Sequence, residues 1–165
     1  MPGSLCPCVI FEKMELTDVY RALCRQRFEE LVQSISMGSL KTYQAFERFK
    51  IFARLNKLNR ERLRKAIPQL WQRLEAGEQE LTKELSQAVL ISNLAMVAEI
   101  LDFLEIRHDG NGFFEKDTTA AEQLKTGWQQ RVLEKFSGKY SEPLLLLYIN
   151  HLDWELGKPS APFVP

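Results

Sequence analysis

The sequence has few of the features that mark secreted, membrane-spanning or disulfide-rich proteins. Its three cysteines are an odd number without framework spacing, which argues against a disulfide scaffold and for a reducing compartment. The longest unbroken apolar runs, Leu94–Ala98 and Leu144–Ile149, fall far short of the roughly 20 residues that a membrane-spanning helix needs. The N-terminal stretch also lacks the charged and apolar regions of a secretory signal. We therefore expect a cytoplasmic protein without a membrane span.

Recognisable catalytic and cofactor motifs are missing as well. The chain contains no G-x-S-x-G nucleophile elbow, no phosphate-binding P-loop and no G-x-G-x-x-G dinucleotide fingerprint. No residue pattern indicates a cofactor. These absences favour a non-catalytic protein.

What the sequence does contain is helical periodicity, without any strand-like alternation. At 165 residues the chain is long enough for one domain with a sizeable core. We predict an all-α fold, a compact bundle of about six helices in one domain over residues 14–157. A flexible N-terminal arm, 1–13, precedes it and an extended C-terminal tail, 158–165, follows it. The predicted helices span about 16–37, 40–55, 60–76, 78–106, 119–137 and 141–157. The spacing of Thr119 and Glu122 is that of a capping box and predicts the start of the fifth helix. The predicted apolar face of the first helix consists of Val19, Leu23, Cys24, Phe28, Leu31, Val32 and Ile35.

The fourth predicted helix, 78–106, contains the longest mostly apolar passage of the chain. Its polar residues fall along one side, and large apolar side chains fill the rest of the circumference. A helix that is apolar around most of its surface is buried on most sides. We therefore place this helix at the centre of the bundle, with a possible bend near Asn93.

The third predicted helix carries a start signal and a disruption. Asn59 is suited to cap its N-terminus, and Leu63, Ile67, Leu70, Trp71 and Leu74 form its predicted buried face. Pro68 falls inside this pattern and removes one backbone donor, which predicts a kink or a break.

Charge is segregated along the chain although the formal net charge is zero. Residues 38–74 carry 10 basic and 2 acidic side chains, whereas residues 75–117 carry 3 basic and 10 acidic ones. A basic surface interleaved with aromatic residues can bind phosphates and stack on bases. The candidate residues for binding a polyanion are Lys41, Arg48, Lys50, Arg54, Lys57, Arg60, Arg62, Arg64 and Lys65. Alternatively, the aromatics belong to the core and the charges are solvated, or they pair with the acidic segment in the same molecule or a partner.

A second set of candidates could line a pocket or bind a metal. Glu105 and His108 form one Glu-x-x-His, the spacing that helical bundles use twice, with two further Glu, in di-metal centres. His151 lies near carboxylates on the last predicted helix and is the best candidate for a general base. The alternative is a solvated acidic edge with two unrelated histidines. The candidates are Glu99, Asp102, Glu105, His108, His151, Asp153 and Glu155.

One loop, residues 107–117, resembles a calcium-binding loop only superficially. With Gly112 at the sixth position, the first and twelfth positions are Arg107 and Thr118, where a calcium site needs carboxylates. A tight turn is the better interpretation. Phe113 and Phe114 in this loop either tuck beneath it or form an exposed contact.

Three hypotheses about function follow. We favour a non-catalytic helical protein that acts through protein–protein contact or self-association, with a homodimer possible. The second hypothesis is a module that binds nucleic acid or another polyanion through residues 41–65. The third is a metal-dependent or small-molecule enzyme around Glu105, His108 and His151.

Overall fold

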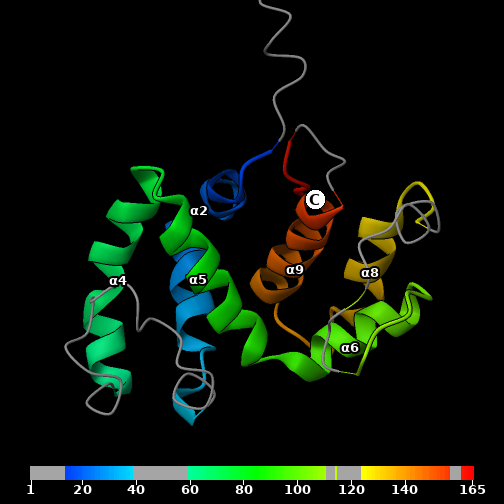
Figure 1. Cartoon of the computed structure of the whole chain (residues 1–165), viewed down its shortest axis with the longest axis horizontal. Coiled ribbons are helices and arrows are strands. Elements are labelled where there is room, and N and C mark those ends of the chain that lie inside the picture. The colour runs from blue at the N-terminus through cyan, green and yellow to red at the C-terminus, as the bar shows by residue number, and fades with distance from the viewer. Residues whose placement is uncertain (1–13, 39–58, 111–113, 115–123, 157–160) are drawn as a thin grey trace, which may run out of the picture.

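A computed structural model describes residues 14–38, 59–110, 114, 124–156 and 161–165 of the chain. Within these residues the fold is all-α and has no strand, as predicted. The six helices are α2 (Leu16–Gln33), α4 (Arg60–Glu75), α5 (Gln79–Ile91), α6 (Leu94–Phe103), α8 (Trp128–Phe136) and α9 (Glu142–Glu155). The predicted arm 1–13 and the predicted helix 40–55 lie outside the described residues. Figure 1 shows α4 at one end of the long axis, α6 and α8 at the other, and α9 between them.

The first helix is bent, which the sequence pattern did not predict. The backbone of α2 leaves the helical region at Cys24, where φ is 65° and ψ is 167°, a conformation that favours glycine. The two halves of α2 therefore point in different directions (Figure 1). This change places Leu23 and Phe28 in the core, whereas the Cys24 side chain is exposed instead of lying on the buried face.

α4 agrees closely with the predicted third helix. The Asn59 side chain accepts a hydrogen bond of 2.9 Å from the backbone N–H of Arg62, so Asn59 is the N-cap. Of the predicted buried face, Leu63, Ile67, Leu70 and Leu74 are buried, whereas Trp71 is only half-buried. The predicted break at Pro68 is absent, because Pro68 lies on the exposed side, where water can satisfy the carbonyl that loses its partner.

The single central helix predicted over residues 78–106 is instead two helices. α5 ends at Ile91, α6 begins at Leu94, and the two meet at an angle of 84°. Only as this bent pair do they have the length and apolar composition of a membrane span. No single helix among the described residues is long and apolar enough to cross a membrane.

Two polar side chains explain where this segment breaks. The Ser92 hydroxyl donates to the carbonyl of Ala88 at 2.8 Å, and the Asn93 amide donates to the carbonyl of Val89 at 2.7 Å. Such bonds compete with the backbone N–H groups that would continue the helix. The chain therefore turns near Asn93, where the sequence allowed a bend.

The most buried helix is α9, rather than the segment 78–106. Every residue from Pro143 to Asp153 is buried, and α9 packs against both α2 and α8. α9 is apolar around its circumference over Leu144–Ile149, so neighbours on several sides are needed to remove it from water. The core is therefore organised around the last helix of the chain.

α8 starts later than predicted. The Thr119 and Glu122 pair that suggested a helix start lies outside the described residues, but residues 124–127 are not helical and α8 begins at Trp128. Gly127 immediately precedes the helix with φ of 85°, a conformation that a side chain would strain.

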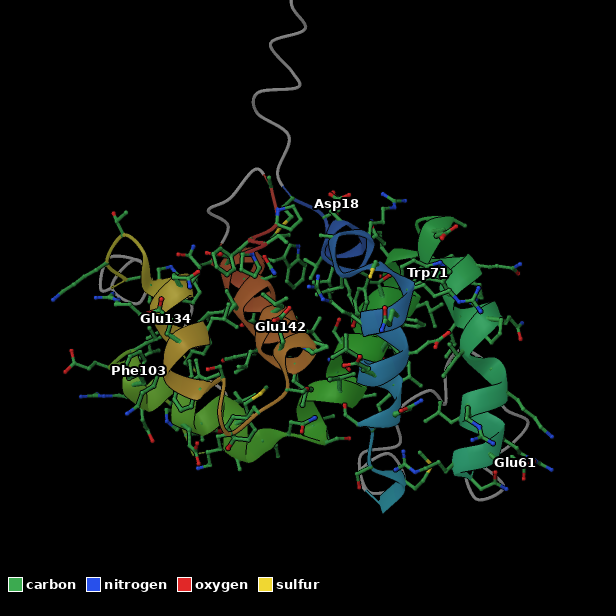
Figure 2. The ribbon with its side chains drawn as sticks, turned by 180° about the vertical axis from the view of Figure 1, so that it is seen from behind. Asp18, Glu61, Trp71, Phe103, Glu134 and Glu142 are labelled. Carbon is green, nitrogen blue, oxygen red and sulfur yellow. The ribbon has the colours of Figure 1, made fainter. Side chains whose placement is uncertain are left out.

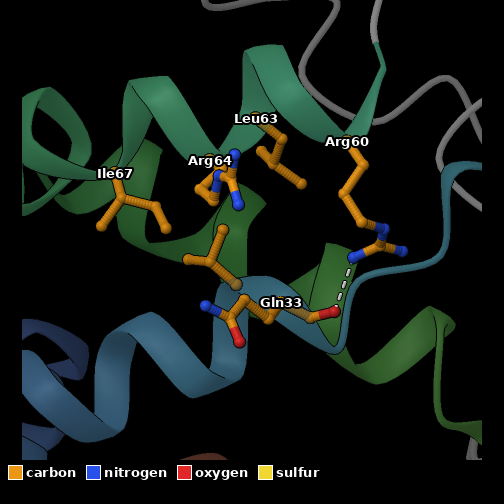
Figure 3. A pocket seen from close by; sticks show the side chains of 6 residues that line it. Gln33, Arg60, Leu63, Arg64 and Ile67 are labelled. Carbon is orange, nitrogen blue, oxygen red and sulfur yellow. Dashed lines mark hydrogen bonds between the residues drawn. The ribbon is translucent and has the colours of Figure 1, made fainter.

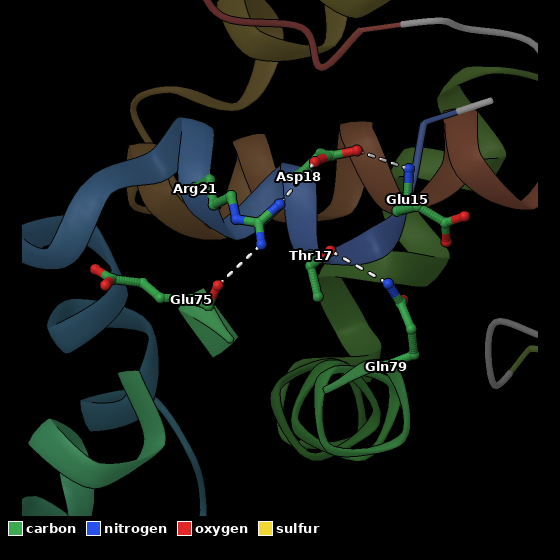
Figure 4. Close-up of polar contacts among 6 residues, drawn as sticks. All are labelled: Glu15, Thr17, Asp18, Arg21, Glu75 and Gln79. Carbon is green, nitrogen blue, oxygen red and sulfur yellow. Dashed lines mark hydrogen bonds and ion pairs between the residues drawn. The ribbon is translucent and has the colours of Figure 1, made fainter. Parts of the chain in front are cut away.

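Polar contacts tie the start of α2 to the junction of α4 and α5 (Figure 4). Arg21 donates to the carbonyl of Glu75 at 2.9 Å and to the carboxylate of Asp18 at 3.3 Å. Gln79 on α5 donates to the hydroxyl of Thr17 at 3.3 Å. These bonds fix the position of α4, which carries the basic surface, relative to the rest of the core.

Candidate functional site

A pocket of about 470 Å³ lies between α2 and α4 (Figure 3). Its lining residues on α4 follow the i, i+3, i+4, i+7 spacing, so one stripe of this helix forms the wall. α2 contributes the opposite wall. The lining residues are Arg60, Leu63, Arg64 and Ile67 on α4, and Val32 and Gln33 on α2.

The floor of this pocket is aliphatic and its rim is polar. Val32, Leu63 and Ile67 are buried, with exposed fractions of 1%, 1% and 4%. In Figure 3, Leu63 and Ile67 point from α4 toward α2. Gln33 and Arg64 are exposed at the rim. No acidic residue is among the described residues that line this pocket, so they combine an apolar floor with positive charge.

Arg60, one of the predicted polyanion ligands, has a structural role at the end of α2. Its guanidinium donates to the carbonyl of Gln33 at 2.6 Å and to that of Ile35 at 2.8 Å. The last carbonyls of a helix have no partner within the helix and carry partial negative charge, so a cation stabilises them. Two of the five guanidinium donors of Arg60 form these bonds.

The other predicted cations of α4 divide into paired and unpaired groups. Lys65 lies 3.2 Å from the carboxylate of Glu61, one turn earlier. Arg62 and Arg64 are exposed and have no ion pair in the part of the chain that the structure describes. The remaining predicted polyanion ligands, Lys41, Arg48, Lys50, Arg54 and Lys57, lie outside the described residues.

Three carboxylates of the acidic segment are paired with cations within the molecule. Glu78 lies 2.7 Å from Arg73, Glu80 lies 3.6 Å from Lys83, and Glu99 lies 2.7 Å from Lys139. The hydrogen bonds from Arg73 and Lys139 lower the pKa of Glu78 and Glu99 respectively. Among the described residues, only the Arg73–Glu78 ion pair joins the basic segment 38–74 to the acidic segment 75–117. The charges of these segments therefore do not simply cancel each other.

A second, smaller pocket at the other end of the molecule carries charge of both signs. It measures about 230 Å³, and its lining includes Glu105 from the turn after α6 together with Lys125 and Arg131. Phe103, labelled in Figure 2, also lines it and is one of two large apolar side chains that are notably exposed among the described residues, at 40%. Its ring contacts Phe136 edge-on, with centroids 5.7 Å apart. The described lining of this pocket therefore has two cations and one carboxylate.

The predicted metal-site residues are placed in separate pairs. His108 lies 2.7 Å from Asp102, and Nδ1 of His151 lies 3.8 Å from the carboxylate of Glu155. Glu99 is bonded to Lys139, and Glu105 is exposed with φ of 60°. Among the described residues, no group of three or more His, Cys, Asp or Glu could hold a metal ion. The geometry therefore provides no support for the metal hypothesis.

The polar cluster of α9 holds neighbouring parts of the chain. The amide of buried Asn150 donates to the carbonyls of Leu146 and Phe163, and its oxygen accepts from the N–H of Phe163 at 2.6 Å. The carboxylate of Asp153 accepts a hydrogen bond of 3.1 Å from Gln129 next to the start of α8. Asn150 thus fixes the C-terminal tail, and Asp153 joins α9 to α8.

The phenylalanine loop is only partly described. Phe114 is half-buried and packs against the core, which agrees with a ring tucked beneath the loop. Phe113 lies outside the described residues, so its role as a contact residue stays a prediction.

Sequence reasoning missed the α2 side of the larger pocket. Val32 belongs to the predicted apolar face of the first helix, and Gln33 follows it without any distinguishing pattern. The pocket forms because the end of α2 packs against the start of α4. Gln33 and Arg60 are hydrogen-bonded there although they lie 27 residues apart in the chain. Periodicity within one helix cannot reveal such a junction.

Comparisons with protein-family models, with curated proteins and with solved structures found no match for this chain.

Proposed function

We propose that this is a non-catalytic protein that binds an acidic partner protein through the surface of α4 around the larger pocket. We refer to the side chains of Arg60, Leu63, Arg64 and Ile67 as the α4 stripe. The proposal keeps the protein-contact hypothesis and selects a surface for it. The expected location is still the cytoplasm.

One observation carries this proposal. Arg64 lies at the rim of an aliphatic pocket and has no acidic partner among the described residues, whereas most acidic side chains of α5 and α6 already have a cation or an imidazole beside them. Unpaired charge next to apolar surface is the arrangement in which a partner of opposite charge gains specificity and a faster association rate.

The pocket suits a protein better than a nucleic acid. Binding of single-stranded nucleic acid relies on aromatic rings on which bases stack. The aromatic residue of α4, Trp71, packs against Phe28 with centroids 5.2 Å apart, and none of the described residues that line the pocket is aromatic. An aliphatic floor offers apolar side chains a place to bind but offers a base nothing to stack on.

Site-specific photo-crosslinking tests the proposal. A photoreactive amino acid replaces Arg64 in one variant and Gln130, an exposed position on α8, in a matched control. Both variants are irradiated in the cells that produce the protein, and the adducts are separated after nuclease treatment. We expect discrete protein adducts from position 64 and none of the same mass from position 130.

Three outcomes contradict the proposal. Identical adducts from both positions would indicate non-specific contact, and adducts that nuclease removes would support the nucleic-acid hypothesis instead. The absence of any adduct from position 64 would show that this surface is only solvated. Sedimentation at low salt and at about 0.15 M salt tests whether the partner is a second copy of the chain. If it is, the protein forms a salt-sensitive dimer and position 64 gives an adduct of twice the chain mass.

A further inference from the structure

We infer that the partner bound by the α4 stripe is an acidic amphipathic helix, whose apolar face enters the pocket and whose carboxylates bind Arg64. This inference rests on the proposed function and names the partner's chemistry. It follows from the shape, the spacing and the charge of the pocket.

The walls of the pocket are helices, and their spacing matches a third helix. Leu63 and Ile67 are one turn apart on α4, and Val32 on α2 completes the aliphatic floor. A helix presents its own apolar side chains at i, i+3, i+4 and i+7, so two or three of them can follow this floor. From residue 60 to residue 67 the stripe rises about 10 Å, close to two turns of a partner helix.

The volume agrees with this occupant. About 470 Å³ lies within the roughly 300–1,000 Å³ typical of pockets that take small molecules. A pocket of this size between two helices can take protruding side chains of a third helix.

The charge at the rim selects an acidic helix. Arg60 and Arg64 are one turn apart along the same edge, and the part of the lining that the structure describes contains no carboxylate. Two donors of Arg60 already form hydrogen bonds with carbonyls at the end of α2, so Arg64 provides most of the free positive charge. A basic or neutral amphipathic helix would leave Arg64 without a partner beside a newly dehydrated apolar contact, which is unfavourable.

Binding of two labelled peptides to the full chain, measured by fluorescence anisotropy, tests the inference. One peptide has leucines on one helical face and glutamates on its flanks. The other has the same composition, with its leucines scattered around the helix. We expect the amphipathic peptide to bind at about 0.15 M salt and the scattered isomer to bind at least about tenfold more weakly.

Two charge reversals on the same helix provide the matched control. Arg64 and Arg62 are both exposed and both lack an ion pair among the described residues, but only Arg64 lines the pocket. Arg64→Glu should weaken peptide binding at least about tenfold, whereas Arg62→Glu should change it less than about threefold. Gln33→Trp, at an exposed position, should fill the rim and abolish binding without unfolding the protein.

Several results would overturn the inference. Equal binding of the two peptides, or equal losses for the two arginine variants, would reduce the interaction to general attraction of acidic chains. Stronger competition by duplex DNA than by unlabelled amphipathic peptide would indicate a nucleic-acid site. If position 64 forms protein adducts in cells but neither peptide binds, the contact surface stands and the helical partner does not. If position 64 forms no adducts, the proposed function itself fails.

Discussion

The two ends of the molecule differ in how their surface charge is used. α4, at one end, carries five basic and two acidic side chains, and the described lining of its pocket has arginine without any acid. At the other end, α6 and α8 together carry two basic and three acidic side chains, and their pocket contains both signs. Glu99 on α6 is bonded to Lys139, which follows α8 in the chain. The two pockets therefore differ in whether a carboxylate accompanies the cations among their described lining residues.

This comparison teaches that charge along a sequence is a poor guide to charge on a surface. Residues 75–117 have a net charge of −7, but Glu78 and Glu99 pair with Arg73 and Lys139, which lie outside this segment. In the basic segment, Lys65 and Arg73 are in ion pairs, whereas Arg62 and Arg64 have none among the described residues. Self-association would be favoured by attraction between a basic end of one copy and an acidic end of another. This arrangement has less support than the binding of an external acidic partner.

The largest expected effect is the loss of stability when a buried leucine is truncated. We expect similar losses at both ends of the molecule, which would show that the two ends are equally well packed and differ only in charge. Leu70 on α4 and Leu101 on α6 are both fully buried. Leu70→Ala and Leu101→Ala should each lower the free energy of unfolding by about 2–5 kcal/mol, because each leaves a cavity in the core. Urea denaturation measures both. A cost below about 1 kcal/mol at either site would show that this end is loosely packed.

A smaller effect on stability is expected for two buried tyrosine hydroxyls in the core, one with a hydrogen-bond partner and one without. The buried hydroxyl of Tyr20 is 2.8 Å from the Ser86 hydroxyl, whereas the buried hydroxyl of Tyr148 has no hydrogen-bond partner among the described residues. Burial raises the pKa of both tyrosines, so both stay neutral. Tyr20→Phe should lower the free energy of unfolding by about 1 kcal/mol, and Tyr148→Phe should leave it unchanged or raise it slightly.

Thermal and urea unfolding of the two phenylalanine variants measure this difference. Ser86 also donates to the carbonyl of Thr82 at 2.9 Å, so it keeps a partner when the Tyr20 hydroxyl is removed and the cost stays moderate. A clear loss of stability in Tyr148→Phe would mean that its hydroxyl is satisfied after all, and the contrast would disappear.

The smallest effect concerns the neutralised end. The hydrogen bond from Lys139 lowers the pKa of Glu99, so Lys139→Ala should raise this pKa toward that of an ordinary glutamate, as measured by NMR titration. Lys135→Ala, at an exposed position of α8, should leave it unchanged. Because the folded pKa is the lower one, the pair stabilises the fold above the unfolded pKa, and this contribution is lost as the pH falls through the folded pKa. An unchanged Glu99 pKa in Lys139→Ala would show that the ion pair is not populated in solution.

Much of the fold could be predicted because most helices have local sequence signals, such as a capping residue and an apolar face. α4 was predicted to within one residue at its end, since Asn59 caps it and its leucines keep one face. The prediction of a single central helix was wrong at Asn93. The apolar pattern there continues through a break in the helix, which two side-chain hydrogen bonds cause. The bend of α2 at Cys24 has no sequence signal, since glycine is the residue expected there.

The candidate site was only half visible in the sequence. The basic residues of α4 were identified from their charge, but their roles depend on neighbours from other elements. Arg60 is occupied by the end of α2, Lys65 by Glu61, and Arg64 by none of the described residues. Nothing in the spacing of these three cations distinguishes them. Only the packing of α2 against α4 separates a structural arginine from an available one.

The position of α9 in the core also has a consequence for how the protein is made. α9 is the last helix of the chain, and it packs against α2, the first helix that the structure describes. During synthesis α4 and α5 can pack against α2 early, but the part of α2 that α9 covers has no native neighbour until the ribosome has added more than a hundred further residues. The core closes only when α9 emerges, so the synthesis of α9, rather than formation of the early helices, times the completion of this core.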